Sequence, residues 1–158
     1  MNDKVLIIVA NSSLEVESMF TSGAVSTLDK YGIDYDSVTA PQIVGVPSVL
    51  GIVLDSFEYD GVIILGAIMR QSDDGTGPVN DMYNLEYLEC VRGVNDLAMH
   101  FTLPVGFGIV NITPCSDGLL RKIMEVAAKA TESCIELIKI KQLHQAYNAT
   151  DSGQYKHN

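Results

Sequence analysis

The chain has 158 residues, of which 47% are hydrophobic and 19% charged, a balance typical of one globular domain and not of a disordered chain. Its 20 acidic and 10 basic residues give a formal net charge of −10, which argues against nucleic acid as a partner because phosphate neutralisation needs clustered cations. No apolar run reaches the roughly 18 residues of a membrane span or resembles a signal peptide, so we expect a cytoplasmic protein that contacts no membrane.

The first two elements are predicted from an apolar run and a helical repeat. Residues 4–10 (KVLIIVA) are continuously apolar, as expected for a strand that is buried on both faces. The Asn-Ser-Ser that follows offers a helix N-cap, and apolar residues then recur at helical spacing over 16–28. Gly32 is a natural stop for this helix.

The same alternation continues along the chain. Strands are predicted over 33–40, 59–67 and 103–112, a proline-bounded loop over 41–47, and helices over 48–57, 83–101 and from Ser116 or Asp117 to about 142. Strands that alternate with helices predict a four-stranded parallel sheet with helices on both faces. We expect one α/β domain over 1–145, an oligomer that buries its apolar helices, and a polar, disordered tail over 146–158.

Ligands of an open parallel sheet bind beyond the carboxyl ends of its strands. The segments predicted there are 11–13, 41–46, 68–82 and 111–116, which carry mainly hydroxyl and amide groups and a few carboxylates. The histidines, His100, His144 and His157, lie elsewhere, which excludes a Ser–His–Asp or Cys–His arrangement. The cysteines, Cys90, Cys115 and Cys134, match no zinc or disulfide spacing, so we expect buried thiols.

The remaining motifs are weak on their own. GTGP (75–78) lacks the lysine of a phosphate-binding loop, and GFG (106–108) lies inside a predicted strand, where glycine permits close backbone packing. The carboxylate runs DSFEYD and QSDDG have no EF-hand pattern, and we expect no metal. Arg121 and Lys122 fall in the first turns of the last helix, where a phosphate group can bind, although a surface cation explains Arg121 equally well.

Five stretches stand in an order and spacing that point to one family. They are VLIIVANS…SGA (5–24), VTAPQIVGVP (38–47), YDGVIILGAIMR (59–70), LPVGFGIV (103–110) and LLRKIMEVAAKA (119–130). Together they resemble the 6,7-dimethyl-8-ribityllumazine synthases of riboflavin biosynthesis, over about residues 4–142. The resemblance implies a flavodoxin-like three-layer α/β/α sandwich that forms pentamers, with sites at subunit interfaces. The implied reaction condenses 5-amino-6-(D-ribitylamino)uracil with 3,4-dihydroxy-2-butanone 4-phosphate, releasing phosphate and water without a cofactor.

The resemblance also implies roles for single residues. Arg121 falls on the family's phosphate-holding arginine, Lys129 on a lysine beyond it, and Phe107 on an aromatic that reaches the neighbouring subunit's heterocycle pocket. The backbone clamp for the pyrimidine falls on Ile43, Val44 and Gly45, and the strand-end contacts fall on Ala67, Ile68 and Met69. We therefore expect a transferase that binds two small molecules, with Arg121 as its phosphate anchor.

Three positions depart from the family pattern. Ser12, followed by Ser13, stands where the family stacks an aromatic on the pyrimidine, and Gly45 replaces a carboxylate that binds the ribityl chain. Met82 takes the place of the family's acid/base histidine, after an insertion at 71–81. Asp73, Asp74 or Asp81 are the candidates to replace that histidine, although a carboxylate beside a phosphate adds repulsion.

Two other functions stay open from the sequence. One is a catalytically impaired relative of the same fold that binds lumazine or flavin, and the other is an unrelated, monomeric flavodoxin-like nucleotide-binding domain. The first predicted strand begins almost at Met1, which leaves little room for the N-terminal segment of the family's sixty-subunit shells. We therefore predict a free pentamer or a decamer.

Overall fold

A computed structural model describes residues 2–69, 78–112 and 118–155, with side chains described for 2–69, 81–112 and 118–147. The elements run along the chain as β1 (Lys4–Ala10), α1 (Leu14–Tyr31), β2 (Asp34–Ala40), the 3-10 helix η1 (Ile43–Gly45), α2 (Val46–Ser56), β3 (Gly61–Met69), α3 (Pro78–Phe101), β4 (Val105–Ile112) and α4 (Leu119–Tyr155).

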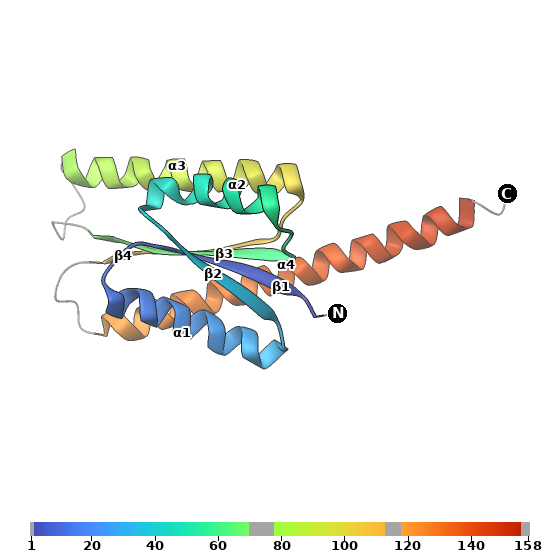
Figure 1. The fold of residues 1–158 in the computed structure, drawn as a ribbon, viewed down its shortest axis with the longest axis horizontal. Coiled ribbons are helices and arrows are strands. Elements are labelled where there is room, and N and C mark those ends of the chain that lie inside the picture. The colour runs from blue at the N-terminus through green and yellow to red at the C-terminus, as the bar shows by residue number, and fades with distance from the viewer. Residues whose placement is uncertain (1, 70–77, 113–117, 156–158) are drawn as a thin grey trace.

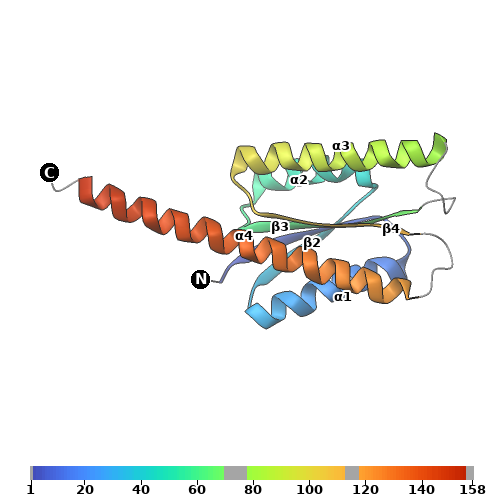
Figure 2. The same ribbon diagram turned by 180° about the vertical axis from the view of Figure 1, so that it is seen from behind.

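The four strands form one parallel sheet in the order β2-β1-β3-β4. Helices α2 and α3 cover one face, and α1 and α4 cover the other, as Figures 1 and 2 show from opposite sides. The order matches the first four strands of a flavodoxin-like sheet. The predicted three-layer α/β/α sandwich with a four-stranded parallel sheet is therefore confirmed.

The sheet separates two apolar cores, and the alternation along β1 explains how. Val5, Ile7 and Val9 join the core beneath α1 and α4. Leu6, Ile8 and Ala10 join the core beneath α2 and α3. Successive side chains of a strand point to opposite faces, so a continuous apolar run fills both cores at once.

Helix α1 begins and ends where the sequence predicts. The Ser13 hydroxyl accepts a hydrogen bond from the Val16 backbone N–H at 3.3 Å, which satisfies one of the free donors of the first turn. Gly32 follows the helix with φ at 64°, a left-handed conformation that favours glycine.

Several boundaries in the first half of the chain differ from the prediction by one or two residues. Strand β3 ends at Met69 instead of residue 67, because Ile68 and Met69 still pair with β4. The predicted loop 41–47 contains η1, and α2 begins at Val46, since Pro47 fits the first turn of a helix.

The last two helices are longer than predicted. Helix α3 begins at Pro78, five residues before the predicted start, and proline is again compatible with a first turn. Helix α4 continues past residue 142 to Tyr155, so residues 146–155, which we predicted as a polar tail outside the domain, are helical. No proline interrupts this stretch, and Figures 1 and 2 show the end of α4 projecting from the body of the molecule.

Glycine brings α4 unusually close to its neighbours. A Cβ placed on Gly106 of β4 would collide with the backbone carbonyl of Ala130, and one on Gly23 of α1 would lie 2.5 Å from the Met124 carbonyl oxygen. The prediction that the GFG segment permits close backbone packing is confirmed. These two contacts fix the first third of α4 against both the sheet and α1.

A polar cluster joins the amino-terminal ends of the strands. The Tyr59 hydroxyl donates to Asp36 at 2.6 Å, and the Lys4 ammonium lies 3.0 Å from the same carboxylate. Burial, and then this hydrogen bond, raise the pKa of Tyr59 from its ordinary value of 10.0 to about 12. The Tyr59 hydrogen bond, and then Lys4, lower the pKa of Asp36.

This cluster predicts a late tyrosine titration. The folded-state pKa of Tyr59 lies above its unfolded value, so the stabilisation is complete below pH 10 and is lost as the pH rises to about 12. In an absorbance titration, the difference between the wild type and Tyr59→Phe should show one tyrosine with a pKa near 12. Asp36→Asn should shift that step toward 10, and a difference curve already centred at 10 would contradict the prediction.

Candidate functional site

The carboxyl ends of the four strands meet at one end of the molecule. At this end β1 leads into α1 on one face, and its neighbour β3 leads toward α3 on the other face (Figure 1). Connections that leave adjacent strands in opposite directions open a crevice between them, the usual ligand site of an open α/β sheet. The starts of α1, α3 and α4 lie at this same end.

The loop after β1 is held by its own hydrogen bonds. The Ser12 backbone N–H donates to the Glu17 carboxylate at 2.8 Å, while Ser13 caps α1. Asn11 donates its backbone N–H to the Ala40 carbonyl at 2.8 Å, which joins the ends of β1 and β2. A small, half-buried hydroxyl therefore occupies position 12, where the resemblance implies a stacking aromatic.

The predicted backbone clamp forms η1, directly beside the crevice. The Ile43 side chain is buried against β3, where a Cβ on Gly66 would lie 2.5 Å from its Cδ1 atom. The Val44 side chain is exposed, and the Gly45 N–H donates to the Gln42 carbonyl at 3.0 Å. Because the side chain of Ile43 fills the core, this segment offers a ligand its backbone groups and the exposed Val44 side chain.

The three residues at the end of β3 differ in how exposed their side chains are. Ile68 belongs to the core beneath α2 and α3, Ala67 is half-buried, and Met69 is exposed. They pair with Val110, Asn111 and Ile112 of β4. Ala67 and Met69 are therefore the strand-end side chains that remain accessible at this rim.

Met82 lies on a helix and not in the loop that the sequence predicted. Both Met82 and Asp81 lie in the early turns of α3, and both side chains are exposed. Arg70, Asp73 and Asp74 lie outside the described residues. Asp81 is thus the one candidate for proton transfer that the described part of the chain places beside Met82.

Phe107 lies within a strand and not at the rim. It pairs with Ile64 in the middle of β3, and its half-buried ring packs against the core beneath α2 and α3. Its strand, β4, is an edge of the sheet. Phe107 therefore lies level with Ile64 on an edge strand, three positions before the rim residue Ala67.

Arg121 and Lys129 lie on the outer side of α4. The Arg121 side chain is 86% exposed, and its Nε atom lies 3.1 Å from the Glu125 carboxylate. Lys129 is exposed two turns further along. The first turn of α4 contains no acidic residue, so two cations, Arg121 and Lys122, occupy the positive end of the helix dipole.

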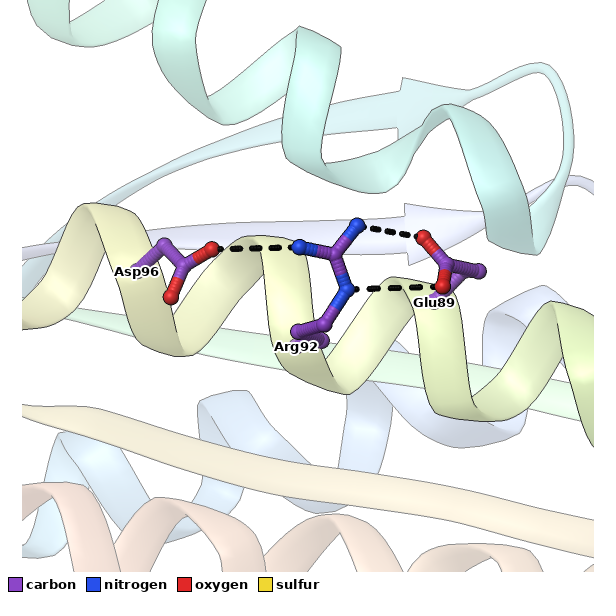
Figure 3. Close-up of polar contacts among 3 residues, drawn as sticks. All are labelled: Glu89, Arg92 and Asp96. Carbon is purple, nitrogen blue, oxygen red and sulfur yellow. Dashed lines mark hydrogen bonds and ion pairs between the residues drawn. The ribbon is translucent and has the colours of Figure 1, made fainter.

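Arg92 is more fully neutralised than Arg121. Arg92 on α3 lies between two carboxylates, with Nη2 2.6 Å from Glu89 and Nη1 3.5 Å from Asp96 (Figure 3). Arg121 has only Glu125 among the described side chains. The positive end of the helix dipole and the charge of Lys122 both repel the Arg121 cation. An added anion is therefore stabilised more strongly at Arg121 than at Arg92.

The histidines and cysteines among the described residues lie away from this rim. His100 is in the last turn of α3, and His144 lies on α4 with Nδ1 3.0 Å from the Ile140 carbonyl. Cys90 and Cys134 are buried and free, as predicted, and burial raises their pKa values to about 11 and about 12. His157 and Cys115 lie outside the described residues.

The described residues contain no cluster of three or more His, Cys, Asp or Glu side chains that could hold a metal ion. No helix among them is both long and apolar enough to cross a membrane. A groove of about 1100 Å³ lies at the opposite end of the sheet, between the last turns of α3 and the middle of α4. None of the predicted site residues lines it.

One chain brings together only part of the predicted site. The rim holds Ser12, Ser13, Ile43, Val44, Gly45, Ala67, Ile68 and Met69. Met82 lies on α3, Phe107 within β4, and Arg121 and Lys129 on the outer side of α4. Glu125 was missed, although its position four residues after Arg121 is the spacing of a helical ion pair.

Comparison with known proteins points to one family. The model of the 6,7-dimethyl-8-ribityllumazine synthase family matches residues 2–142. A 6,7-dimethyl-8-ribityllumazine synthase from Paramagnetospirillum magneticum is 28% identical over 149 residues, which is 88% of this chain and 95% of the relative.

Two solved structures are similar at low levels. A lactose-specific IIB component domain of the phosphoenolpyruvate:carbohydrate phosphotransferase system from Streptococcus pneumoniae is 13% identical, with a TM-score of 0.37 and coverage of 86% of this chain and 97% of the other. A short-chain flavodoxin associated with a non-canonical PDU bacterial microcompartment is 9% identical, with a TM-score of 0.40 and coverage of 84% and 99%.

Proposed function

The chain belongs to the 6,7-dimethyl-8-ribityllumazine synthase family, and we propose that it is a working synthase. It condenses 5-amino-6-(D-ribitylamino)uracil with 3,4-dihydroxy-2-butanone 4-phosphate and releases phosphate and water. The observation that carries this proposal is the cationic first turn of α4, where Arg121 is exposed beside Lys122. A protein that binds only a heterocycle has no need of such a phosphate anchor.

The chemistry of the substrates suits the polar rim. The amine of the pyrimidine is itself the nucleophile, and the phosphate of the ketone is the leaving group. The protein mainly has to hold the two molecules in a reactive orientation and stabilise the departing charge. Backbone groups of η1 and the hydroxyls of Ser12 and Ser13 support the first task, and Arg121 supports the second.

We infer that the complete site needs two copies of the chain. Arg121 and Lys129 project from the outer side of α4, and Phe107 lies on an edge strand, whereas the pyrimidine clamp lies at the rim. A neighbouring copy that covers the β4 edge places its own rim beside Arg121, Lys129 and Phe107 of the first copy. The pentamer or decamer predicted from the sequence provides such neighbours, and analytical ultracentrifugation tests it.

An impaired relative that binds lumazine or flavin is the alternative. It is favoured by Ser12, Gly45 and Met82, which replace an aromatic, a carboxylate and a histidine implied by the family resemblance. Incubation of the protein with both substrates separates the two functions. A synthase produces the absorbance and fluorescence of the lumazine, whereas the impaired relative binds added lumazine without forming it.

Asp81 is expected to take part in proton transfer in place of the missing histidine. Asp81→Asn should lower kcat by about tenfold, less than the usual 10²–10⁴-fold for a general acid or base, because its side chain is exposed to water. Adding Met82→His in the same chain should restore turnover, since an imidazole then stands at the family's position.

Leu85→His is the matched control, because it adds an imidazole one turn further along the exposed side of α3. It should not restore the turnover of Asp81→Asn. If Asp81→Asn turns over as fast as the wild type, Asp81 has no role in proton transfer.

A further inference from the structure

A charged stripe on α4 contains one carboxylate between two cations, the predicted phosphate anchor Arg121 and the predicted substrate-binding Lys129. Arg121, Glu125 and Lys129 are spaced four residues apart, so they lie along one side of the helix. Glu125 is paired with Arg121 through Nε at 3.1 Å. Because Arg precedes Glu, the pair has the less favourable orientation with respect to the helix dipole.

The atom of Arg121 that contacts Glu125 determines which donors of the guanidinium remain available to a ligand. Glu125 accepts from the Nε–H of Arg121, so the two Nη groups of the guanidinium stay available for a phosphate group. An incoming phosphate therefore does not need to displace Glu125. Instead, the carboxylate remains next to the bound phosphate and repels it.

We propose that Glu125 attenuates the phosphate anchor, so that Arg121 captures the phosphorylated ketone but does not retain the released phosphate. This inference rests on the proposed function of Arg121. One negative charge near an exposed site changes the affinity for an anion by about twofold to fivefold. The charge also favours departure of inorganic phosphate, the product that must leave the same site before the next turnover.

Glu125→Gln tests the charge alone, because the amide oxygen still accepts the Nε–H bond. Inorganic phosphate, measured as a competitive inhibitor against the ketone, should bind about twofold to fivefold more tightly to this variant. The KM for the ketone should fall by a similar factor without a rise in kcat. The difference from the wild type should shrink as salt is added, since the site is exposed.

Glu136→Gln is the matched control. Glu136 is an exposed residue of the same helix, paired with Lys139 at 3.3 Å, and its substitution changes the net charge equally. It should leave phosphate inhibition unchanged. In the Arg121→Ala background, Glu125→Gln should lose most of its effect on phosphate inhibition, because the positive charge that Glu125 attenuates is gone.

Three outcomes would overturn the inference. One is unchanged phosphate inhibition in Glu125→Gln, and another is an equal tightening in Glu136→Gln. The third is weaker phosphate binding in Glu125→Ala, which would make Glu125 a support for the guanidinium instead of a competing charge. These results differ from a failure of the proposed function, in which Arg121→Ala itself leaves phosphate inhibition unaltered.

Discussion

Replacing Arg121 with alanine is expected to raise the KM for 3,4-dihydroxy-2-butanone 4-phosphate by about tenfold to a hundredfold. Hydrogen bonds between a guanidinium and a phosphate are charge-assisted and often bidentate, and their loss typically has an effect of this size. The phosphate is also the leaving group, so kcat should fall as well. Steady-state kinetics at varied ketone concentration measure both parameters.

A second variant at position 121 and a control on the same helix separate the effect of charge from that of guanidinium geometry. Arg121→Lys keeps the charge but offers a single ammonium instead of a planar fork, so it should recover only part of the affinity. Lys139→Ala removes one cation from the same helix, at a residue already paired with Glu136, and should leave the kinetics unchanged. The KM for the pyrimidine should change little in all three variants.

An Arg121→Ala enzyme with an unaltered ketone KM and an unaltered kcat would contradict the phosphate role. Helix α4 would then lie away from the reaction, and the cationic first turn would be a surface feature. The proposed division of the site between two copies would lose its main support as well, because it rests chiefly on the outward position of Arg121 and Lys129 on α4.

The fold was predictable because its elements have strong local signals. The apolar run of β1 predicts burial on both faces, and Ser13 and Gly32 mark the ends of α1 by their capping chemistry. Strand–helix alternation then leaves few arrangements other than a parallel sheet with two helical layers. The ends of β3 and α4 were less predictable, since they depend on pairing with β4 and on the absence of a stop signal.

The candidate site was predictable only where it depends on backbone position. The rim after β1, η1 and β3 follows from the sheet topology, and the structure brings those segments together. The pairing of Arg121 with Glu125 depends on side-chain geometry along a helix, which residue types alone do not determine. In the proposed site shared between copies, Phe107 and Lys129 would serve the rim of another chain, so no local pattern connects them to the rim of their own.

Gly106→Ala is expected to cause a larger loss of stability than alanine at any other of the described glycines. The new Cβ would collide with the Ala130 carbonyl oxygen and lie 2.9 Å from the carbonyl carbon. These are backbone atoms of α4, so neither a rotamer change nor a flexible side chain can relieve the contact. We expect the free energy of unfolding to fall by about 3 kcal/mol or more, measured by urea denaturation.

Alanine substitutions at Gly108 and Gly51 should cost progressively less stability than Gly106→Ala. Gly108→Ala meets the Leu65 side chain at 2.8 Å, which can move, so its cost should be smaller. Gly51→Ala lies within α2 with its nearest neighbour at 4.0 Å, and should be neutral or stabilise the helix by about 0.5–1 kcal/mol.

The close contact between Gly106 and α4 also links the stability of the fold to the position of Arg121. The Ala130 carbonyl and the Met124 carbonyl are where α4 touches β4 and α1, and Arg121 lies one turn before Met124. A methyl at position 106 pushes α4 away from the sheet and moves the guanidinium with it. Folded Gly106→Ala should therefore bind inorganic phosphate more weakly than Gly108→Ala does. Equal urea midpoints for Gly106→Ala and the wild type would show that α4 is not held at this distance, and that the position of Arg121 has another cause.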